Sequence, residues 1–201
     1  PSSGTTSVQK DDAGSWTLSG SNTYSGGTTV NVGTLVVGAV YALGANNGSA
    51  VNLNGGTLKV NTAQTLTKNL VVSGTNTVNN AAGGTVNLVG SITGSGTLTL
   101  VTPNGAVITQ DGSLAGFSGT LVISGAGNGG LFLAQNDYSI TSTGSAVAAF
   151  QLNGGSRGIY LMNNNSAGTA YMGELSGTGG AIYSKFGRTG DVILEVGALN
   201  T

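Results

Sequence analysis

The fold of this chain is decided by the stretch Gly26-Gly27-Thr28-Thr29-Val30, a glycine doublet followed at once by a short β-like segment. The doublet returns along the sequence as Gly26-Gly27, Gly55-Gly56, Gly83-Gly84, Gly129-Gly130, Gly154-Gly155 and Gly179-Gly180, with a degenerate copy at Asn104-Gly105. A turn signal thus recurs roughly every 25 residues, a period that indicates stacked supersecondary units.

The segments between the turns are typical of strands. Apolar and polar residues alternate in Val51-Asn52-Leu53 and in Leu58-Lys59-Val60, and no stretch shows helical spacing of apolar residues. A repeating unit of this size holds three short strands and three turns. The sequence therefore predicts an all-β, single-stranded parallel β-helix of about seven to eight coils. An antiparallel sandwich also has short strands and frequent turns, but the regular return of the doublet favours the β-helix.

Composition limits the function. The chain has 201 residues, of which 37 are glycine, 6% are charged and none is cysteine or histidine, and its net charge is −1. The six lysine and arginine residues are scattered along the chain and form no basic patch, so the sequence argues against nucleic-acid binding through phosphate contacts. The missing cysteine and histidine exclude a disulfide scaffold, a thiolate metal site and a Ser-His-Asp triad within the chain. We expect one β-helix domain over residues 1–201 with a lead-in at 1–14, cut from a larger protein.

A longer stretch carries a family resemblance. Residues 8–60 contain Asn22-Thr23-Tyr24, Gly26-Gly27-Thr28, Gly33-Thr34-Leu35 and Asn54-Gly55-Gly56-Thr57-Leu58, and this pattern closely resembles the autotransporter-associated β-strand repeat. The resemblance implies a right-handed parallel β-helix in a secreted or surface-displayed bacterial protein, either an autotransporter passenger or another large extracellular protein. It carries over no catalytic residue. The turn asparagines of such a solenoid could also stack as side-chain ladders along the rod.

Carboxylates are the first candidate for chemistry, because glycoside hydrolysis needs two of them close together. Asp11, Asp12, Asp111 and Asp137 fall in predicted turns, and Glu174 lies apart from them. Asp191 and Glu195 are four residues apart on a predicted strand, so they share one face, and Lys185 and Arg188 precede them. We interpret the acids as solvated turn and surface charges. We therefore expect no enzyme activity, no metal and no cofactor.

Tyrosines near the C-terminus are the second candidate. Tyr160, Tyr171 and Tyr183 occur on neighbouring predicted strands, and Tyr160 and Tyr183 are 23 residues apart, close to one coil. Stacked tyrosines could bind sugar rings, with Arg157 and Arg188 beside them, or they could pack in the core. Threonine pairs such as Thr65-Leu66-Thr67 and Thr97-Leu98-Thr99 do not return at one coil position, which disfavours an ice-binding array.

The sequence thus predicts a structural or adhesin-type β-helix, either passenger or stalk, exported to the bacterial surface or the extracellular space. Its expected partners are neighbouring domains of the parent protein and surface glycans or cell surfaces, not nucleic acid or membrane. The alternative is a carbohydrate-binding or polysaccharide-processing β-helix with its site on the C-terminal coils.

Overall fold

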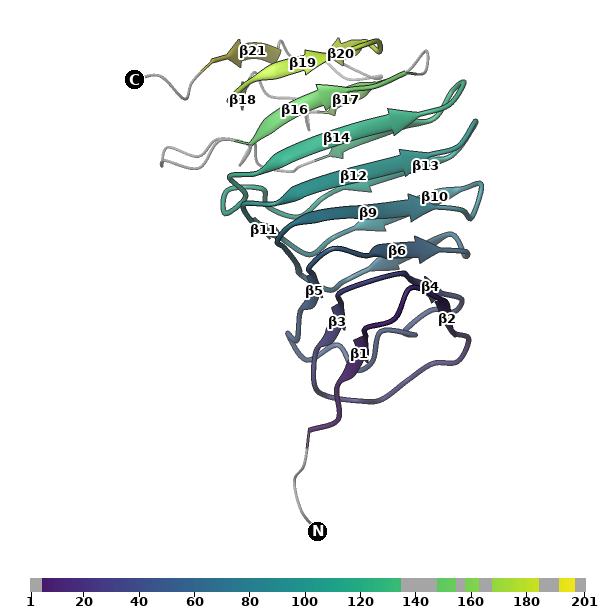
Figure 1. Cartoon of the computed structure of the whole chain (residues 1–201). Helices are drawn as coiled ribbons and strands as arrows, with labels where there is room; N and C mark the ends of the chain where they lie inside the picture. The colour runs from purple at the N-terminus through teal and green to yellow at the C-terminus, as the bar shows by residue number, and fades with distance from the viewer. Residues whose placement is uncertain (1–4, 135–147, 155–157, 163–167, 185–191, 198–201) are drawn as a thin grey trace.

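The fold is a parallel β-solenoid. The computed structural model describes residues 5–134, 148–154, 158–162, 168–184 and 192–197. Every regular element among these residues is a β-strand, and every named strand pair is parallel. Figure 1 shows the strands stacked as rungs of a rod, with the N-terminus at one end and the last strands at the other. The predicted all-β parallel solenoid is confirmed.

The described strands form four sheets. Sheet A contains β1 (Val8–Lys10), β3 (Thr28–Val30), β5 (Val51–Leu53), β8 (Leu70–Val72) and β11 (Ile92–Gly94). Sheet B contains β2 (Ser15–Leu18), β4 (Thr34–Val37), β6 (Thr57–Val60), β9 (Thr75–Asn80), β12 (Thr97–Thr102), β14 (Thr120–Gly125), β16 (Ala149–Leu152) and β19 (Leu175–Gly177). Sheet C contains β7 (Gln64–Leu66), β10 (Thr85–Leu88), β13 (Val107–Gln110), β15 (Gly130–Ala134), β17 (Ile159–Met162) and β20 (Ile182–Ser184). Sheet D pairs β18 (Gly168–Met172) with β21 (Val192–Val196).

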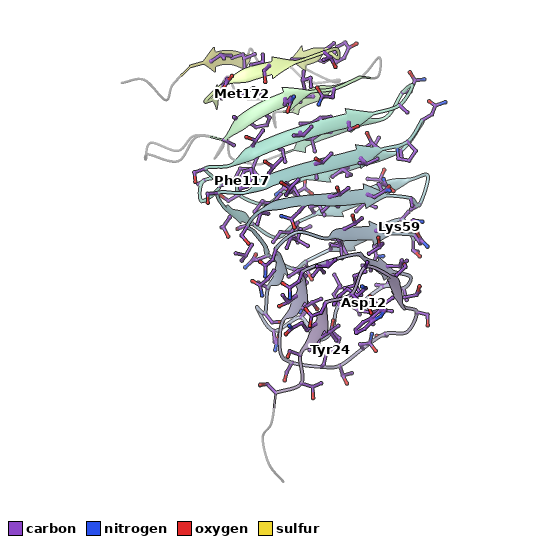
Figure 2. All side chains as sticks on the ribbon, in the orientation of Figure 1. Asp12, Tyr24, Lys59, Phe117 and Met172 are labelled. Atoms are coloured by element: carbon purple, nitrogen blue, oxygen red, sulfur yellow. The ribbon has the colours of Figure 1, made fainter. Side chains whose placement is uncertain are left out.

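The core lies inside the rod because each strand alternates apolar and polar side chains. In β12, Leu98 and Leu100 are fully buried while Thr97, Thr99 and Val101 are half-exposed. Successive strand residues point to opposite faces, so one row of each strand enters the core and the next faces outward. Figure 2 shows side chains from the faces filling the interior, with the buried Phe117 among them.

The coil is shorter than the glycine recurrence predicted. Paired residues from β1 to β15 are 19 to 23 positions apart, as for Val51 with Leu70 and Ile108 with Leu131. Most later steps are longer, as where Thr120 pairs with Ala149 and Leu131 with Ile159. The solenoid has about six turns rather than seven to eight. Complete three-strand coils run from β5 to β13, and the coils at both ends lack a strand on at least one of the three faces in the described residues.

The reason for the difference is that the doublets do not mark one corner. Gly26-Gly27 precedes a strand of sheet A, Gly55-Gly56 a strand of sheet B, and Gly83-Gly84 a strand of sheet C. The first two steps between doublets are therefore one coil plus one side. Gly129-Gly130 leads into β15 of sheet C, the same sheet that follows Gly83-Gly84, so the 46 residues between these two doublets are about two coils.

Other glycines allow the coils to approach closely. Gly90 and Gly112 occupy one corner in successive coils, and a Cβ on Gly112 would overlap the carbonyl oxygen of Gly90. A second column contains Gly74, Gly96 and Gly119, where a Cβ on Gly96 or Gly119 would overlap the carbonyl of the glycine below. Only a residue without a Cβ lets one backbone pass this close to the next.

An amide ladder runs along the corner after sheet A. Ser73 Oγ donates to Asn54 Oδ1 at 2.8 Å, Asn54 Nδ2 to Asn31 Oδ1 at 2.8 Å, and Asn31 Nδ2 to Asp11 Oδ1 at 2.6 Å. These residues follow paired strand ends in successive coils. The predicted stacking of turn asparagines is therefore found here. Each side chain donates to the one in the preceding coil, so the chain of hydrogen bonds ends at the Asp11 carboxylate. Hydrogen bonds in such a chain polarise one another.

The outer face of sheet B carries a threonine row. Thr34, Thr57, Thr77 and Thr99 pair in sequence on four consecutive strands and are all half-exposed. Thr65 belongs to sheet C, so the two pairs considered in the sequence do lie in different sheets. The in-register row is formed by other threonines, which cross-strand packing of β-branched side chains favours.

Candidate functional site

The candidate site is the outer row of sheet C. This row is the set of residues that the strand register aligns one above another as Thr65, Asn87, Thr109, Phe132, Tyr160 and Tyr183. At the neighbouring register position, Ile108, Leu131 and Ile159 are fully buried. Strand positions alternate between the two faces of a sheet, so the described side chains of this row lie on the face away from the core. The side chains of Phe132 and Tyr160 are outside what the structure describes.

Aromatic residues occupy the C-terminal half of this row. Phe132 pairs with Tyr160 and Tyr160 with Tyr183, so three consecutive strands present an aromatic residue at one register position. Tyr183 is 40% exposed. Thr65 is exposed, and Asn87 and Thr109 are half-exposed. None of the six residues is charged. The row is therefore uncharged, aromatic at one end, and amide- and hydroxyl-bearing at the other.

The structure separates the predicted site residues. Tyr160 and Tyr183 lie side by side in sheet C. Tyr171 lies on β18 in sheet D, where it pairs with Glu195, so it does not share their row. Arg157 and Arg188 lie outside the described residues. Sequence reasoning missed Phe132, although an aromatic residue between two apolar ones is visible in both Leu131-Phe132-Leu133 and Ile159-Tyr160-Leu161.

The acidic residues that the structure describes do not gather into a catalytic or metal-binding cluster. Among the described residues, no group of three or more acidic, histidine or cysteine side chains is placed to hold a metal ion. Asp111 and Glu174 are exposed and lie far apart in the coil order. Asp137, Lys185 and Asp191 lie outside the described residues, as does the side chain of Glu195.

Asp11 and Asp12 serve the N-terminal end of the rod. Asn31 and Gln9 donate to the Asp11 carboxylate and lower its pKa. Lys10 continues the core row of Val30 and Leu53 and is fully buried. Its ammonium bonds to the Asp12 carboxylate, which lowers the pKa of Asp12. These contacts account for both carboxylates without assigning them a catalytic role.

The buried Lys10 closes the exposed end of the core. Its Nζ also donates to Val32 O at 3.3 Å and lies 5.4 Å from the centre of the Trp16 ring. Trp16 pairs with the buried Leu35 but is itself 45% exposed, because β2 is the last strand at this edge of sheet B. A cation that is hydrogen-bonded and placed over an aromatic ring can be buried at an acceptable free-energy cost.

Pockets on the described part of the rod include one beside β7 and one beside β19. One separates the edge strand β7 from the segment 41–46 and is lined by Gln64 and Lys68, among others. Burial lowers the pKa of Lys68, whose ammonium contacts Ala45 O and, at 2.9 Å, Ser49 Oγ. The other pocket opens beside β19 over Leu152 and Gly177. Neither pocket is lined by an acidic residue.

The comparisons with known proteins agree with the fold. Geometry places the chain in the class of repeat-built parallel β-solenoids. Within it, residues 8–37 match the family described as passenger-associated-transport-repeat, which covers β1 to β4. This match confirms the resemblance drawn from the sequence, and the chain contains an autotransporter-associated repeat. No curated protein and no solved structure matches the chain. The repeat motif and the solenoid fold together are typical of a passenger-type structural module.

Among the described residues, no helix has the length and apolarity needed to cross a membrane.

Proposed function

We propose that this chain is a non-catalytic shaft segment of an exported bacterial protein, and that it displays neighbouring domains or contributes to adhesion at the cell surface. The observation that carries the proposal is the repeat of residues 8–37 at the start of a continuous parallel stack. Each coil contacts mainly the coils before and after it, so a solenoid can form one coil at a time. Such growth suits a chain that emerges progressively during export.

The surface chemistry supports the same role. Only 6% of the residues are charged, and the outer rows of sheets B and C are mainly threonine, asparagine and aromatic residues. The acids of the first coil are engaged in structural contacts. A rod with few charges is a suitable spacer. Ligand binding would then take place on the side-chain rows of its outer sheet faces or on attached domains.

The export role is tested by placing the chain upstream of a bacterial translocator barrel and measuring surface protease accessibility. We expect surface display of the native chain and of Gly20→Ala, because a Cβ on Gly20 has no heavy atom within 4 Å. We expect reduced display of Gly112→Ala, since its Cβ would overlap the coil below. Retention of a folded native chain inside the cell would refute the proposal.

Carbohydrate binding is the second candidate function. It is favoured by one observation, the pairing of Tyr160 with Tyr183 in the outer row of sheet C. Tyrosine combines an apolar ring face with a hydroxyl, which suits contact with sugar rings and their hydroxyls. Binding to a broad panel of bacterial and host-surface glycans tests it. A folded chain that binds none of them would remove this candidate and leave the shaft.

A further inference from the structure

We infer that Asn104 is a site of spontaneous deamidation, at which the main chain attacks the side-chain amide and converts the residue to aspartate and isoaspartate. This reaction favours Asn-Gly pairs, because glycine has no side chain to hinder the attack. The sequence contains five such pairs, which begin at Asn47, Asn54, Asn104, Asn128 and Asn153. Hydrogen bonds make Asn104 the most reactive of the four pairs within residues 5–134.

The reaction makes three demands on an Asn-Gly pair. The glycine nitrogen must be free to lose its proton and attack the side-chain carbonyl carbon, the side-chain oxygen must carry negative charge in the intermediate, and the side-chain nitrogen must leave as ammonia. A bond forms between the glycine nitrogen and Cγ as the Cγ–Nδ2 bond breaks, which closes a five-membered imide ring. Water then opens the ring at either carbonyl group, giving aspartate or isoaspartate. Water and hydroxide are the only co-reactants.

Asn104 leaves both reacting nitrogens free. Asn104 and Gly105 are exposed in the turn between β12 and β13. Among the residues that the structure describes, neither Gly105 N nor Asn104 Nδ2 has a hydrogen-bond partner. A Cβ on Gly105 would have no heavy atom within 4 Å, so the surroundings of the attacking nitrogen are open. The nucleophile and the leaving group can therefore react without first breaking a contact.

The next coil stabilises the charge that develops on the side-chain oxygen. The main-chain N–H of Asn128 donates to Asn104 Oδ1 at 2.9 Å. Gly127 permits this contact, because a Cβ there would overlap the Asn104 side chain. A main-chain donor already placed on the oxygen stabilises the tetrahedral intermediate as an oxyanion hole does. The stacking of coils thus promotes the reaction at this corner.

Asn54 is a matched internal control with the opposite bonding. Its Oδ1 also accepts a hydrogen bond, from Ser73 Oγ at 2.8 Å. However, Asn54 Nδ2 donates to Asn31 Oδ1 at 2.8 Å, and Gly55 N donates to Asn76 Oδ1 at 2.6 Å. The leaving group and the nucleophile are both held, so the same dipeptide should resist deamidation here.

The other two pairs are also restrained. Gly129, which follows Asn128, is buried, and its N–H donates to Ala126 O at 3.0 Å. Asn47 is exposed, but its Nδ2 donates to Ser25 O at 2.7 Å. We therefore expect both asparagines to react more slowly than Asn104.

Deamidation would change the chemistry of the turn after β12. Either product adds a negative charge to an exposed corner. Aspartate keeps an acceptor for the Asn128 N–H, whereas isoaspartate adds one carbon to the main chain and moves that acceptor. The turn is closed by the hydrogen bond from Ala106 N to Pro103 O at 2.9 Å, which the longer main chain would disturb.

The test follows the folded native chain in mildly alkaline buffer by mass-spectrometric peptide mapping, with circular dichroism to confirm that it stays folded. We expect Asn104 to convert about tenfold faster than Asn54, because hydrogen bonds hold both reacting nitrogens only at Asn54. Both aspartate and isoaspartate should form, and the two rates should converge in urea. Equal rates at Asn104 and Asn54 in the folded chain would overturn the inference, as would a product that is aspartate alone.

Two variants release the protected control. Asn76→Ala removes the acceptor of the Gly55 N–H, and Asn31→Ala removes the acceptor of Asn54 Nδ2. Either variant should raise the rate at Asn54 severalfold and leave the rate at Asn104 unchanged. Asn76 is buried, so the half-exposed Asn31 keeps the test valid if Asn76→Ala fails to fold. An unchanged rate at Asn54 in every folded variant would show that these hydrogen bonds do not control deamidation, and would overturn the inference.

Discussion

Three glycine-to-alanine substitutions separate the ways in which glycine supports this solenoid. Gly112 has an ordinary φ, but a Cβ there would overlap the carbonyl oxygen of Gly90 in the coil below. Gly83 has a φ of 73°, and a Cβ there would meet nothing within 4 Å. Gly20 has neither constraint. The same chemical change therefore tests the close contact between coils at Gly112 and the backbone conformation at Gly83. At Gly20 it serves as a control for both.

The expected magnitudes differ in sign and size. Gly20→Ala should be neutral or stabilise by up to about 1 kcal/mol, because alanine restricts the unfolded chain. Gly83→Ala should cost about 1–2 kcal/mol, the penalty of an L-residue in the left-handed region. Gly112→Ala should cost about 3 kcal/mol or more, since backbone faces backbone and no side chain can move aside.

Thermal unfolding followed by circular dichroism measures these differences. For a chain of this length, 1 kcal/mol corresponds to about 2–4 °C in Tm. We expect Gly112→Ala to melt about 6 °C or more below the native chain, with Gly83→Ala between it and Gly20→Ala. Equal melting temperatures for Gly112→Ala and Gly20→Ala would refute the argument that close coil contact requires glycine in this column.

Three further predictions concern polar groups. Asn80→Leu should cost about 1–3 kcal/mol in urea denaturation, because the buried Asn80 Nδ2 donates to Gly84 O and Val107 O at 2.8 Å each; an unchanged midpoint would contradict this. Lys10→Met should cost about 1–3 kcal/mol by the same measurement, since it keeps the buried stem but removes the donor to Asp12 and Val32; a gain in stability would show that the cap is dispensable. The contribution of the Asp11 carboxylate to stability should be fully present above about pH 5 and should be lost as pH falls through the lowered folded-state pKa of Asp11, because the unfolded chain binds protons first. Tm measured against pH should fall less steeply for Asp11→Asn, and parallel curves would argue against the ladder as the cause.

Local sequence patterns predicted the parts of this fold that depend on neighbouring residues. The alternation in Leu58-Lys59-Val60 predicted a half-buried strand, and Leu58 and Val60 are fully buried. The asparagines in turns predicted side-chain stacking, which Asn31 and Asn54 form. These predictions succeed because turn conformation and side-chain direction are set within a few residues.

The coil length was predicted less well, and the candidate site only in part. The pairing of Tyr160 with Tyr183 follows from their spacing of one coil, but the step from Phe132 to Tyr160 is 28 residues. A spacing rule based on one period therefore passes over Phe132. Tyr171 illustrates the opposite error, since proximity in sequence placed it with two residues that belong to another sheet.

The sequence by itself determined that this chain is a β-solenoid with an autotransporter-associated repeat, because turns, alternation and the repeat motif are local and survive variation in coil length. Only the tertiary structure decided which residues stack on which. Coil steps vary from 19 to 29 residues, so the register is fixed by main-chain hydrogen bonds between coils rather than by distance along the chain. That register aligns the aromatic row, the glycine columns and the amide ladder, and no single segment of the sequence contains any of them.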